Sequence, residues 1–377
     1  MKPYLINRRC FLALSVGAAG TTLVTGCFNQ PLEKVKVYTG GKDGYHTYRI
    51  PSLLCTPSGN LLAFCEGRKQ SQKDSGKIDL LLKRSQDGGK TWSKQQIIWE
   101  NGDNVCGNPC PVFDQTTGKI YLLMTGNLGS DHEQEIIEQT SKGTRTVWVC
   151  SSQDEGKTWS KPVEITPSVK QPDWTWYATG PGVGIQLQKN DRLVIPCNHC
   201  EAESKKYYSH IFYSDDHGQT WKLGGSSPSD RPGMNECQVV ELANGSLMLN
   251  MRNQNPSPRK RGICLSKDQG LSWSNFSYDS TLIDPTCQAS FLRYIKPNQN
   301  QEGKLIFSNP ASQKERINLT VRLSKDEGKT WPVSRQIDGG PSAYSCLTIL
   351  PDLSIGCLYE CGKSSPYEHI TFVRFQF

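Results

Sequence analysis

The segment Ser85-Gln86-Asp87-Gly88-Gly89-Lys90-Thr91-Trp92 is the first of five copies of one short turn. The other copies occupy residues 152–159, 214–221, 266–273 and 324–331, and all five fit Ser-x-Asp-x-Gly-x-Thr/Ser-Trp. Their first residues, 85, 152, 214, 266 and 324, lie 67, 62, 52 and 58 positions apart, a near-regular period typical of propellers, solenoids and arrays. In each copy the Ser and Asp can hydrogen-bond nearby backbone, the Gly permits a left-handed conformation, and the Trp offers a large surface to bury. We therefore predict a tight hairpin pinned by a tryptophan at each copy.

Each turn follows a short segment that is rich in β-branched or apolar residues, which predicts a β-strand. These segments are 79–84, 146–150, 209–213, 262–265 and 319–323, and similar strands are predicted after the first two turns at 96–99 and 163–165. The chain has 34 Gly and 22 Pro and no long amphipathic helical pattern, so we expect an almost entirely β fold. A repeat of roughly 60 residues fits a four-stranded blade.

The length of the chain sets the expected number of blades. Residues 28–377 divided by the repeat period give about six units, so we predict one domain, a six-bladed β-propeller with five of the repeated turns. The strands predicted at 48–54 and 370–375 lie outside the turn series, and we expect the two ends to close one blade together. A two-sheet sandwich would also be all-β, but it does not explain the tandem turns. Residues 298–303 are expected to form a polar hairpin loop.

The N-terminus, residues 1–27, predicts an export signal. Its first residues are basic, and the apolar run 11–26 is too short and too rich in small residues for a good membrane span. Residues 7–12 resemble a twin-arginine signal. Residues 23–27 resemble a lipoprotein cleavage site, which would leave Cys27 as a lipidated N-terminus. We expect an exported periplasmic or cell-surface protein held at the membrane; an uncleaved N-terminal anchor would predict the same location.

Composition limits the possible partners and cofactors. The net charge of +7 falls to +4 without the three cations of the signal, and no basic cluster contains interleaved aromatics, so a nucleic-acid partner is not indicated. Of 15 cysteines, setting aside Cys10 and Cys27 leaves thirteen, so at least one thiol is unpaired or intermolecular. Many are expected to be small buried core residues. Cys197-Asn-His199-Cys200 could suggest zinc, but it lacks a second ligand pair at fixed spacing, so a structural role is favoured and no metal is expected.

Several strings between the turns together resemble the bacterial exo-α-sialidase (neuraminidase) family, over essentially the whole chain after residue 27. They are Tyr48-Arg49-Ile50-Pro51, Glu66-Gly67-Arg68 with 74–79, Cys106-Gly107-Asn108-Pro109, Asn235-Glu236-Cys237-Gln238, Asn250-Met251-Arg252-Asn253, 316–322 and Ala343-Tyr344-Ser345. The repeated turns resemble the Asp box of that family. An Asp box alone is a weak functional signal, because many other propellers carry it, but all these strings in order are a strong one.

The resemblance implies that Arg49, Arg252 and Arg316 bind the carboxylate of a sialic acid. This fits the chemistry, because guanidinium forks bind a carboxylate bidentately with a geometry that lysine cannot reproduce. Arg68 matches a family position near the substrate. Asn108 is expected to contact the sugar or its N-acyl arm.

The resemblance also implies the catalytic residues. Tyr344 matches the nucleophile, Glu236 its base, and Asp74 the acid that protonates the departing oxygen and later activates water. A neutral phenol suits this substrate, because a carboxylate nucleophile would be repelled by the carboxylate on the anomeric carbon. Asp79 competes as the acid, but it begins a predicted strand and is expected to support structure.

We therefore predict a retaining exo-α-sialidase that hydrolyses terminal α-linked sialic acids from glycoproteins or glycolipids through a tyrosyl-enzyme intermediate, without a cofactor. One alternative is an intramolecular trans-sialidase or transglycosylase with the same site, distinguished by aromatic residues such as Trp174, Trp176 and Tyr177. Others are a non-catalytic sialic-acid-binding propeller and a glycosidase for another acidic sugar.

Overall fold

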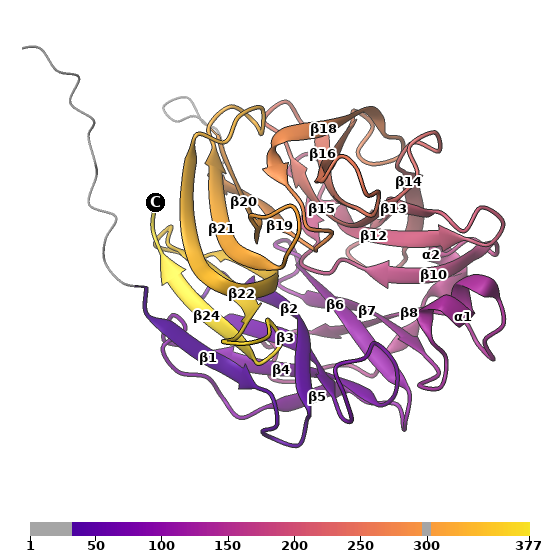
Figure 1. Cartoon of the computed structure of the whole chain (residues 1–377), viewed down its shortest axis with the longest axis horizontal. Helices are drawn as coiled ribbons and strands as arrows, with labels where there is room; N and C mark the ends of the chain where they lie inside the picture. The colour runs from indigo at the N-terminus through magenta and orange to yellow at the C-terminus, as the bar shows by residue number, and fades with distance from the viewer. Residues whose placement is uncertain (1–31, 296–302) are drawn as a thin grey trace, which may run out of the picture. The chain divides into compact units, whose positions relative to one another are not determined.

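Figure 1 shows a computed structural model of the chain, which describes residues 32–295 and 303–377. The predicted export signal at 1–27, including Cys27, lies outside the described residues, as does most of the predicted loop at 298–303. The described part of the chain contains no helix with the length and apolar character needed to cross a membrane.

The strands of the described residues form four hydrogen-bonded, curled sheets (Figure 1). The first contains β2 (Thr47–Cys55), β3 (Leu61–Arg68), β4 (Ile78–Ser85), β5 (Gln96–Trp99), β6 (Val105–Phe113), β7 (Ile120–Asn127), β8 (Thr146–Ser152) and β9 (Val163–Glu164). The second contains β10 (Trp174–Thr179), β11 (Ile185–Gln186), β12 (Leu193–Glu201), β13 (Tyr207–Ser214) and β14 (Lys222–Ser226), and the third β15 (Met234–Glu241), β16 (Leu247–Asn253), β17 (Lys260–Ser266) and β18 (Ser274–Ile283). The fourth contains β19 (Ser290–Ile295), β20 (Lys304–Pro310), β21 (Ile317–Ser324), β22 (Val333–Ile349), β23 (Ile355–Cys361), β24 (His369–Phe375) and β1 (Lys34–Thr39). Two short helices, α1 (Glu133–Glu138) and α2 (Thr166–Val169), lie in loops.

The first and fourth sheets each consist of two antiparallel groups. In the first, one parallel pair between Ile78 and Val105 joins the group β2–β5 to the group β6–β9. In the fourth, the long strand β22 pairs with β21 through its first half and with β23 through its second half. The five strands predicted before the turns correspond to β4, β8, β13, β17 and β21. The all-β prediction is confirmed, and the number of blades stays a prediction.

The two ends of the described chain meet in the fourth sheet. β1 runs antiparallel to β24, with Lys34 opposite Val373. The prediction that the ends join is therefore confirmed, but it named the wrong N-terminal strand, because residues 48–54 lie in β2 and pair with β3. β2 is buried along most of its length and takes an interior position, whereas the half-exposed β1 suits the outer edge of a sheet.

All five repeated turns, which we call boxes 1 to 5 in chain order, contain the same hydrogen bonds. In box 2, Ser152 Oγ donates to Asp154 Oδ1 at 2.9 Å and accepts the Gly156 N–H at 2.9 Å. Asp154 also accepts the Thr158 N–H at 2.8 Å and the Thr158 hydroxyl at 2.6 Å. Corresponding bonds occur in the other four boxes. Partial burial opposes the shift, but these bonds lower the pKa of Asp154 to about 2.

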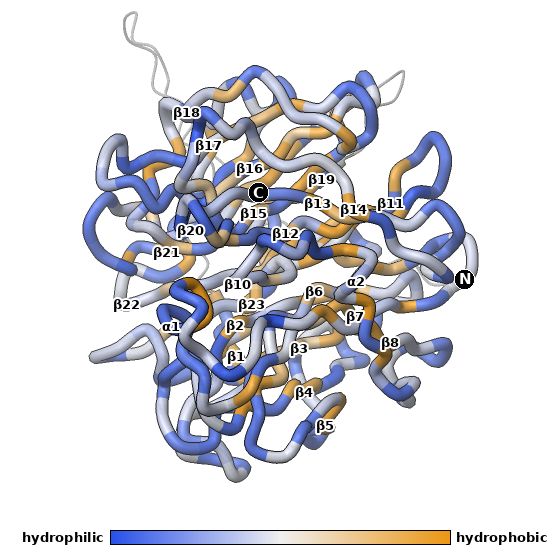
Figure 2. Tube along the Cα trace, turned by 90° about the vertical axis from the view of Figure 1, so that its right-hand side faces the viewer, coloured by the Kyte–Doolittle hydropathy of each residue, from blue (hydrophilic) through white to orange (hydrophobic). Residues whose placement is uncertain are grey.

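The box tryptophans pack each antiparallel group against the preceding one. Trp159 of box 2 lies edge-on against Phe64 in β3, with ring centroids 5.8 Å apart, and boxes 3 and 4 make comparable contacts. Trp92 of box 1 packs against Phe372 in β24 at 5.5 Å, so the first group also contacts the last. Apolar residues concentrate in the strands and hydrophilic residues in the loops (Figure 2), which places the core between neighbouring groups.

Candidate active site

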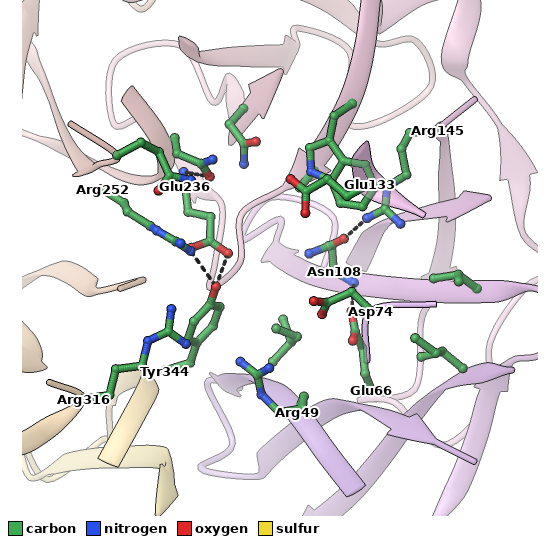
Figure 3. Close-up of a pocket in the computed structure, with 18 residues that line it drawn as sticks. Arg49, Glu66, Asp74, Asn108, Glu133, Arg145, Glu236, Arg252, Arg316 and Tyr344 are labelled. Atoms are coloured by element: carbon green, nitrogen blue, oxygen red, sulfur yellow. Dashed lines mark hydrogen bonds and ion pairs between the residues drawn. The ribbon is translucent and has the colours of Figure 1, made fainter. Parts of the chain in front are cut away.

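One pocket collects the predicted site residues from strands that are far apart in the chain (Figure 3). Seven of the eight residues predicted to act on substrate line it: Arg49, Asp74, Asn108, Glu236, Arg252, Arg316 and Tyr344. The eighth, Arg68, lies behind the pocket wall and contacts Asp74. These seven residues come from β2, β6, β15, β16 and β22 and from loops. Folding therefore brings together the motifs on which the resemblance rests.

Tyr344, Glu236 and Arg252 form a closed set of short contacts. Tyr344 Oη donates to Glu236 Oε1 at 2.7 Å, and Arg252 Nη1 donates to Tyr344 Oη at 2.8 Å and to Glu236 Oε2 at 2.6 Å. Burial and the charge of Glu236 raise the pKa of Tyr344 well above its usual value, although Arg252 opposes this. Tyr344 is therefore a neutral phenol whose proton already points at a carboxylate.

Three arginine side chains surround the Tyr344 ring. The guanidinium carbon of Arg49 lies 5.2 Å from the ring centroid and that of Arg316 lies 5.5 Å from it, while Arg252 bonds to the hydroxyl. Among the described residues, Arg316 donates to neutral oxygens, the Tyr367 hydroxyl at 2.9 Å and the Thr286 carbonyl at 3.0 Å. These incompletely neutralised cations provide a site for an anionic group such as a carboxylate.

A buried carboxylate that the sequence analysis missed fixes Arg49. Glu360 in β23 is fully buried and accepts Arg49 Nε at 2.7 Å. The same side chain accepts the backbone N–H groups of Ile50 at 2.9 Å and Tyr344 at 3.1 Å. Glu360 thus ties an expected carboxylate-binding residue to the backbone of the expected nucleophile.

The strands that form the pocket are irregular where they reach it. Register shifts occur between residues 49 and 52 in β2, 107 and 110 in β6, 174 and 177 in β10, 234 and 237 in β15, and 342 and 345 in β22. Such bulges interrupt the backbone ladder and change the direction of side chains. A backbone N–H that loses its partner in the ladder needs another acceptor. The Asn108 N–H, for example, donates to Glu66 Oε1 at 2.9 Å. Ile50 has a φ of 58°, a strained value for a β-branched residue.

Asp74 lies in the loop between β3 and β4, on the side of the pocket opposite Tyr344 (Figure 3). Its side chain is 62% exposed and accepts Arg68 Nη2 at 2.5 Å, while Arg68 also pairs with Glu66 at 2.7 Å. Burial would raise the pKa of Asp74, but Arg68 and Arg49 outweigh it and lower the pKa. Arg68 therefore contacts Asp74 and Glu66 but does not itself line the pocket. Asp79 is buried, accepts the Tyr45 hydroxyl at 2.7 Å and does not line the pocket, in agreement with a structural role.

Asn108 belongs to a second polar cluster beyond Asp74. Its Oδ1 accepts the Thr125 hydroxyl at 2.8 Å and an Arg145 N–H. Arg145 lies 4.2 Å above the Trp176 ring, and burial lowers its pKa to about 10. Glu133, from α1, also lines the pocket, and burial raises its pKa. Glu133 and Arg145 lie outside the strings that carried the resemblance, so no motif pointed to them.

The aromatic residues considered for an acceptor site have different positions. Trp176 lines the pocket, but Tyr177 is fully buried and Trp174 stacks on His199 with centroids 3.5 Å apart. His199 Nδ1 lies 3.0 Å from His210 Nδ1, and burial lowers the pKa of His199 to about 3.

The thirteen cysteines of the described residues are all free thiols, and all but Cys55 are buried. The described part of the chain contains no group of three or more His, Cys, Asp or Glu side chains that could hold a metal ion. Cys197 and Cys200, next to His199, are therefore core residues of β12.

Comparison with known proteins agrees with this fold. The family model for a BNR repeat-like domain matches residues 59–358. A sialidase of Bacteroides fragilis is 33% identical over 357 residues, which cover 90% of this chain and 63% of that protein. A sialidase of Micromonospora viridifaciens is 34% identical over 340 residues, covering 87% of this chain and 52% of that protein. The solved structure of Hadza microbial sialidase Hz136 has a TM-score of 0.81 at 32% identity and covers 91% of this chain and 68% of that one.

The fold and the pocket thus define an all-β protein of the BNR-repeat class with a pocket lined by arginines, carboxylates and Tyr344. Within that class, the chain belongs to the sialidase family. The resemblance carried by the sequence motifs is confirmed. The chain spans 63% and 52% of the length of the two curated relatives described above.

Proposed function

We propose that this chain is a retaining exo-α-sialidase that releases terminal α-linked sialic acids from glycoproteins or glycolipids. The observation that carries the proposal is the 2.7 Å hydrogen bond between Tyr344 and Glu236 within a set of three arginines. A phenol beside a base and several cations suits a substrate whose reacting carbon bears a carboxylate.

In the first step, Arg49, Arg252 and Arg316 bind the substrate carboxylate. Tyr344 Oη attacks the anomeric carbon while Glu236 takes the phenolic proton, and the bond from that carbon to the glycosidic oxygen breaks. Asp74 gives its proton to the departing oxygen, so the aglycone leaves as an alcohol. The sugar is then held covalently on Tyr344.

In the second step, a water molecule replaces the aglycone. Asp74, now ionised, takes a proton from the water, whose oxygen attacks the anomeric carbon. The bond to Tyr344 Oη breaks, and Glu236 returns the proton to the phenolate. Two displacements at one carbon give net retention of configuration.

The low pKa of Asp74 in the free pocket requires a change on substrate binding, because a general acid must carry a proton. Arg49 is one of the cations that lower this pKa. A bound carboxylate offsets the charge of Arg49, so we expect the pKa of Asp74 to rise when substrate binds.

The test is hydrolysis of a fluorogenic α-sialoside by protein that lacks residues 1–27, with the released sugar identified by mass. Free sialic acid supports the proposal. A product lighter by one water would show the intramolecular trans reaction, and binding without turnover by a folded protein would show the non-catalytic alternative. A sialoside carrying a second acceptor alcohol would report transglycosylation.

We also propose the finer features of fold and location. Six antiparallel groups of strands, with β1 completing the last, support a six-bladed propeller over residues 28–377. Residues 1–27 are proposed to direct export, with Cys27 lipidated. Radiolabelled palmitate incorporated into wild-type protein, and not into Cys27→Ser, would support the anchor; equal membrane recovery of both would argue against it.

A further inference from the structure

The residue after Tyr344 is fixed through all its polar groups. Ser345 is fully buried, and its hydroxyl lies 2.8 Å from the Ser308 hydroxyl. Its N–H donates to Gln288 Oε1 at 3.0 Å, and its carbonyl accepts Gln288 Nε2 at 3.0 Å. One carboxamide therefore pairs with both backbone groups of Ser345, as a neighbouring strand would.

This pairing lies next to a break in the β22–β23 ladder. The register shifts between residues 342 and 345, so Tyr344 lies in the irregular stretch. Its backbone N–H depends on Glu360. Ser345 is the first residue after the irregular stretch to regain a partner in β23, Tyr359. The carboxamide of Gln288 thus fixes the chain on the C-terminal side of the expected nucleophile.

Gln288 itself is rigidly held. It is 1% exposed, and its Nε2 also donates to the Pro181 carbonyl at 3.1 Å. The preceding residue, Cys287, donates its N–H to Asp284 at 2.9 Å and accepts Arg261 Nη1 at 2.7 Å. Asp284 and Arg261 form a completely buried ion pair. The position of Gln288 is therefore fixed from two sides.

We propose that Gln288 is a positioning residue for Tyr344: by fixing the Ser345 backbone, it keeps the Tyr344 hydroxyl within hydrogen-bond reach of Glu236. This inference rests on the proposed function, in which Tyr344 is the nucleophile. A misplacement of about 1 Å can cost on the order of a hundredfold in rate, so this positioning acts mainly on turnover and little on binding of the substrate carboxylate.

Asn309 provides a control. It is fully buried, and its Nδ2 donates to the Ile283 carbonyl at 2.7 Å. Its Oδ1 accepts Arg322 Nη1 at 3.4 Å. It does not line the pocket, and neither of these bonds goes to a residue next to Tyr344 or Glu236. Asn309→Leu therefore removes a buried amide without removing a contact next to either proposed catalytic residue.

The experiment compares kcat, KM, inhibition by free sialic acid and Tm in wild type, Gln288→Met and Asn309→Leu. We expect Gln288→Met to lower kcat by about 10- to 100-fold with KM and inhibitor affinity nearly unchanged. Asn309→Leu should also lose thermal stability but keep its kcat. Equal kcat values for the two variants would overturn the inference.

Two further measurements test the inference if Gln288→Met fails to fold or if the wild type proves inactive. In Gln288→Glu, a protonated carboxyl can still pair with Ser345, so its activity relative to wild type should rise as pH falls; a flat ratio would contradict the inference. Crystal structures should show the Tyr344–Glu236 distance longer than 2.7 Å in a Gln288 variant and unchanged in Asn309→Leu. An inactive wild type would refute the proposed function alone, whereas an unchanged distance would refute the positioning role alone.

Discussion

The Tyr344 side chain occupies an unusual electrostatic position. Burial and Glu236 keep its proton in place, while Arg252 bonds directly to the oxygen that must become nucleophilic. In the proposed mechanism, negative charge develops on that oxygen, where Arg252 would stabilise it, and Glu236 becomes neutral as it accepts the proton. The phenol can therefore react without a free phenolate ever being present in the resting pocket.

Replacing Tyr344 with Phe tests this arrangement. We expect turnover to fall by at least about a thousandfold, because the attacking oxygen is removed. Folding should be preserved, since the ring remains and the 2.6 Å contact between Arg252 and Glu236 is independent of the hydroxyl. Initial rates and thermal unfolding of both proteins provide the measurement. Turnover equal to wild type would refute the assigned nucleophile.

Glu360 supports both Arg49 and Tyr344, so Glu360→Gln is expected to reduce stability strongly. Leaving Arg49 buried without its charge partner costs about 3–5 kcal/mol, measured as the free energy of unfolding in urea. The control is Glu327→Gln, which breaks a more exposed pair with Arg293 and should cost about 0–1 kcal/mol. Similar losses in the two variants would contradict this account of Glu360.

Short strings of sequence were sufficient to find the residues that line the pocket from recognisable motifs, such as Arg49 and Tyr344. They were insufficient for Glu360, whose importance depends on a contact with a residue 311 positions away. Glu66 was quoted within a motif, but its role as an acceptor for the Asn108 N–H depends on a bulge that no local pattern indicated. Arg68 was expected near the substrate. Its sequence string could not show that Arg68 lies outside the pocket lining and contacts Asp74, which does line the pocket.

The boxes and the bulges are the two kinds of element that define this fold, and they differ in how far sequence reveals them. The turn of a box is local, because the hydrogen bonds that join its Ser and Asp to its Gly and Thr or Ser span at most four positions. Its sequence pattern therefore predicts its structure. A bulge, in contrast, depends on the partner strand. The choice between β1 and β2 as the partner of β24 also depends on distant strands, and for this reason the prediction that residues 48–54 close the last blade was wrong.

The box carboxylates should make stability sensitive to acid. Hydrogen bonds, mainly from Thr91, lower the pKa of Asp87 from 3.8 to about 2, and the pKa of Asp154 is also about 2. A lowered pKa in the folded state means that the stabilisation is complete above about pH 4 and is lost as pH falls towards 2. The double variant Asp87→Asn/Asp154→Asn should therefore lose less stability than wild type between pH 5 and pH 2.5.

Urea midpoints at several pH values measure this effect. Asp173→Asn is a suitable control, because Asp173 is exposed and its carboxylate makes no hydrogen bond within the described residues. That variant should follow the wild-type curve. If the urea midpoints of wild type and the double variant fall in parallel as pH is lowered, the box carboxylates do not contribute to acid sensitivity.

On the scale of the whole molecule, closure depends on β1. Tyr38 is 1% exposed and donates its hydroxyl to the Ala63 carbonyl at 2.8 Å, so β1 contacts the β2–β5 group as well as β24. Protein that begins at Gly40 should have a lower Tm than protein that begins at Leu32. It should also aggregate more readily, because the edge of β24 is left unpaired. Differential scanning calorimetry and light scattering test this, and equal values for the two proteins would show that β1 is dispensable.

The pocket takes its residues from segments spread along the chain, from Arg49 to Tyr344. Tyr344 and Glu236 are 108 positions apart, and Asp74 comes from a third segment near the start of the described chain. During refolding, box hairpins can therefore form early, whereas contacts between distant segments form slowly. Catalytic competence should then be the last property that a refolding molecule regains, so the time course of its enzymatic activity reports the moment at which the chain completes its fold.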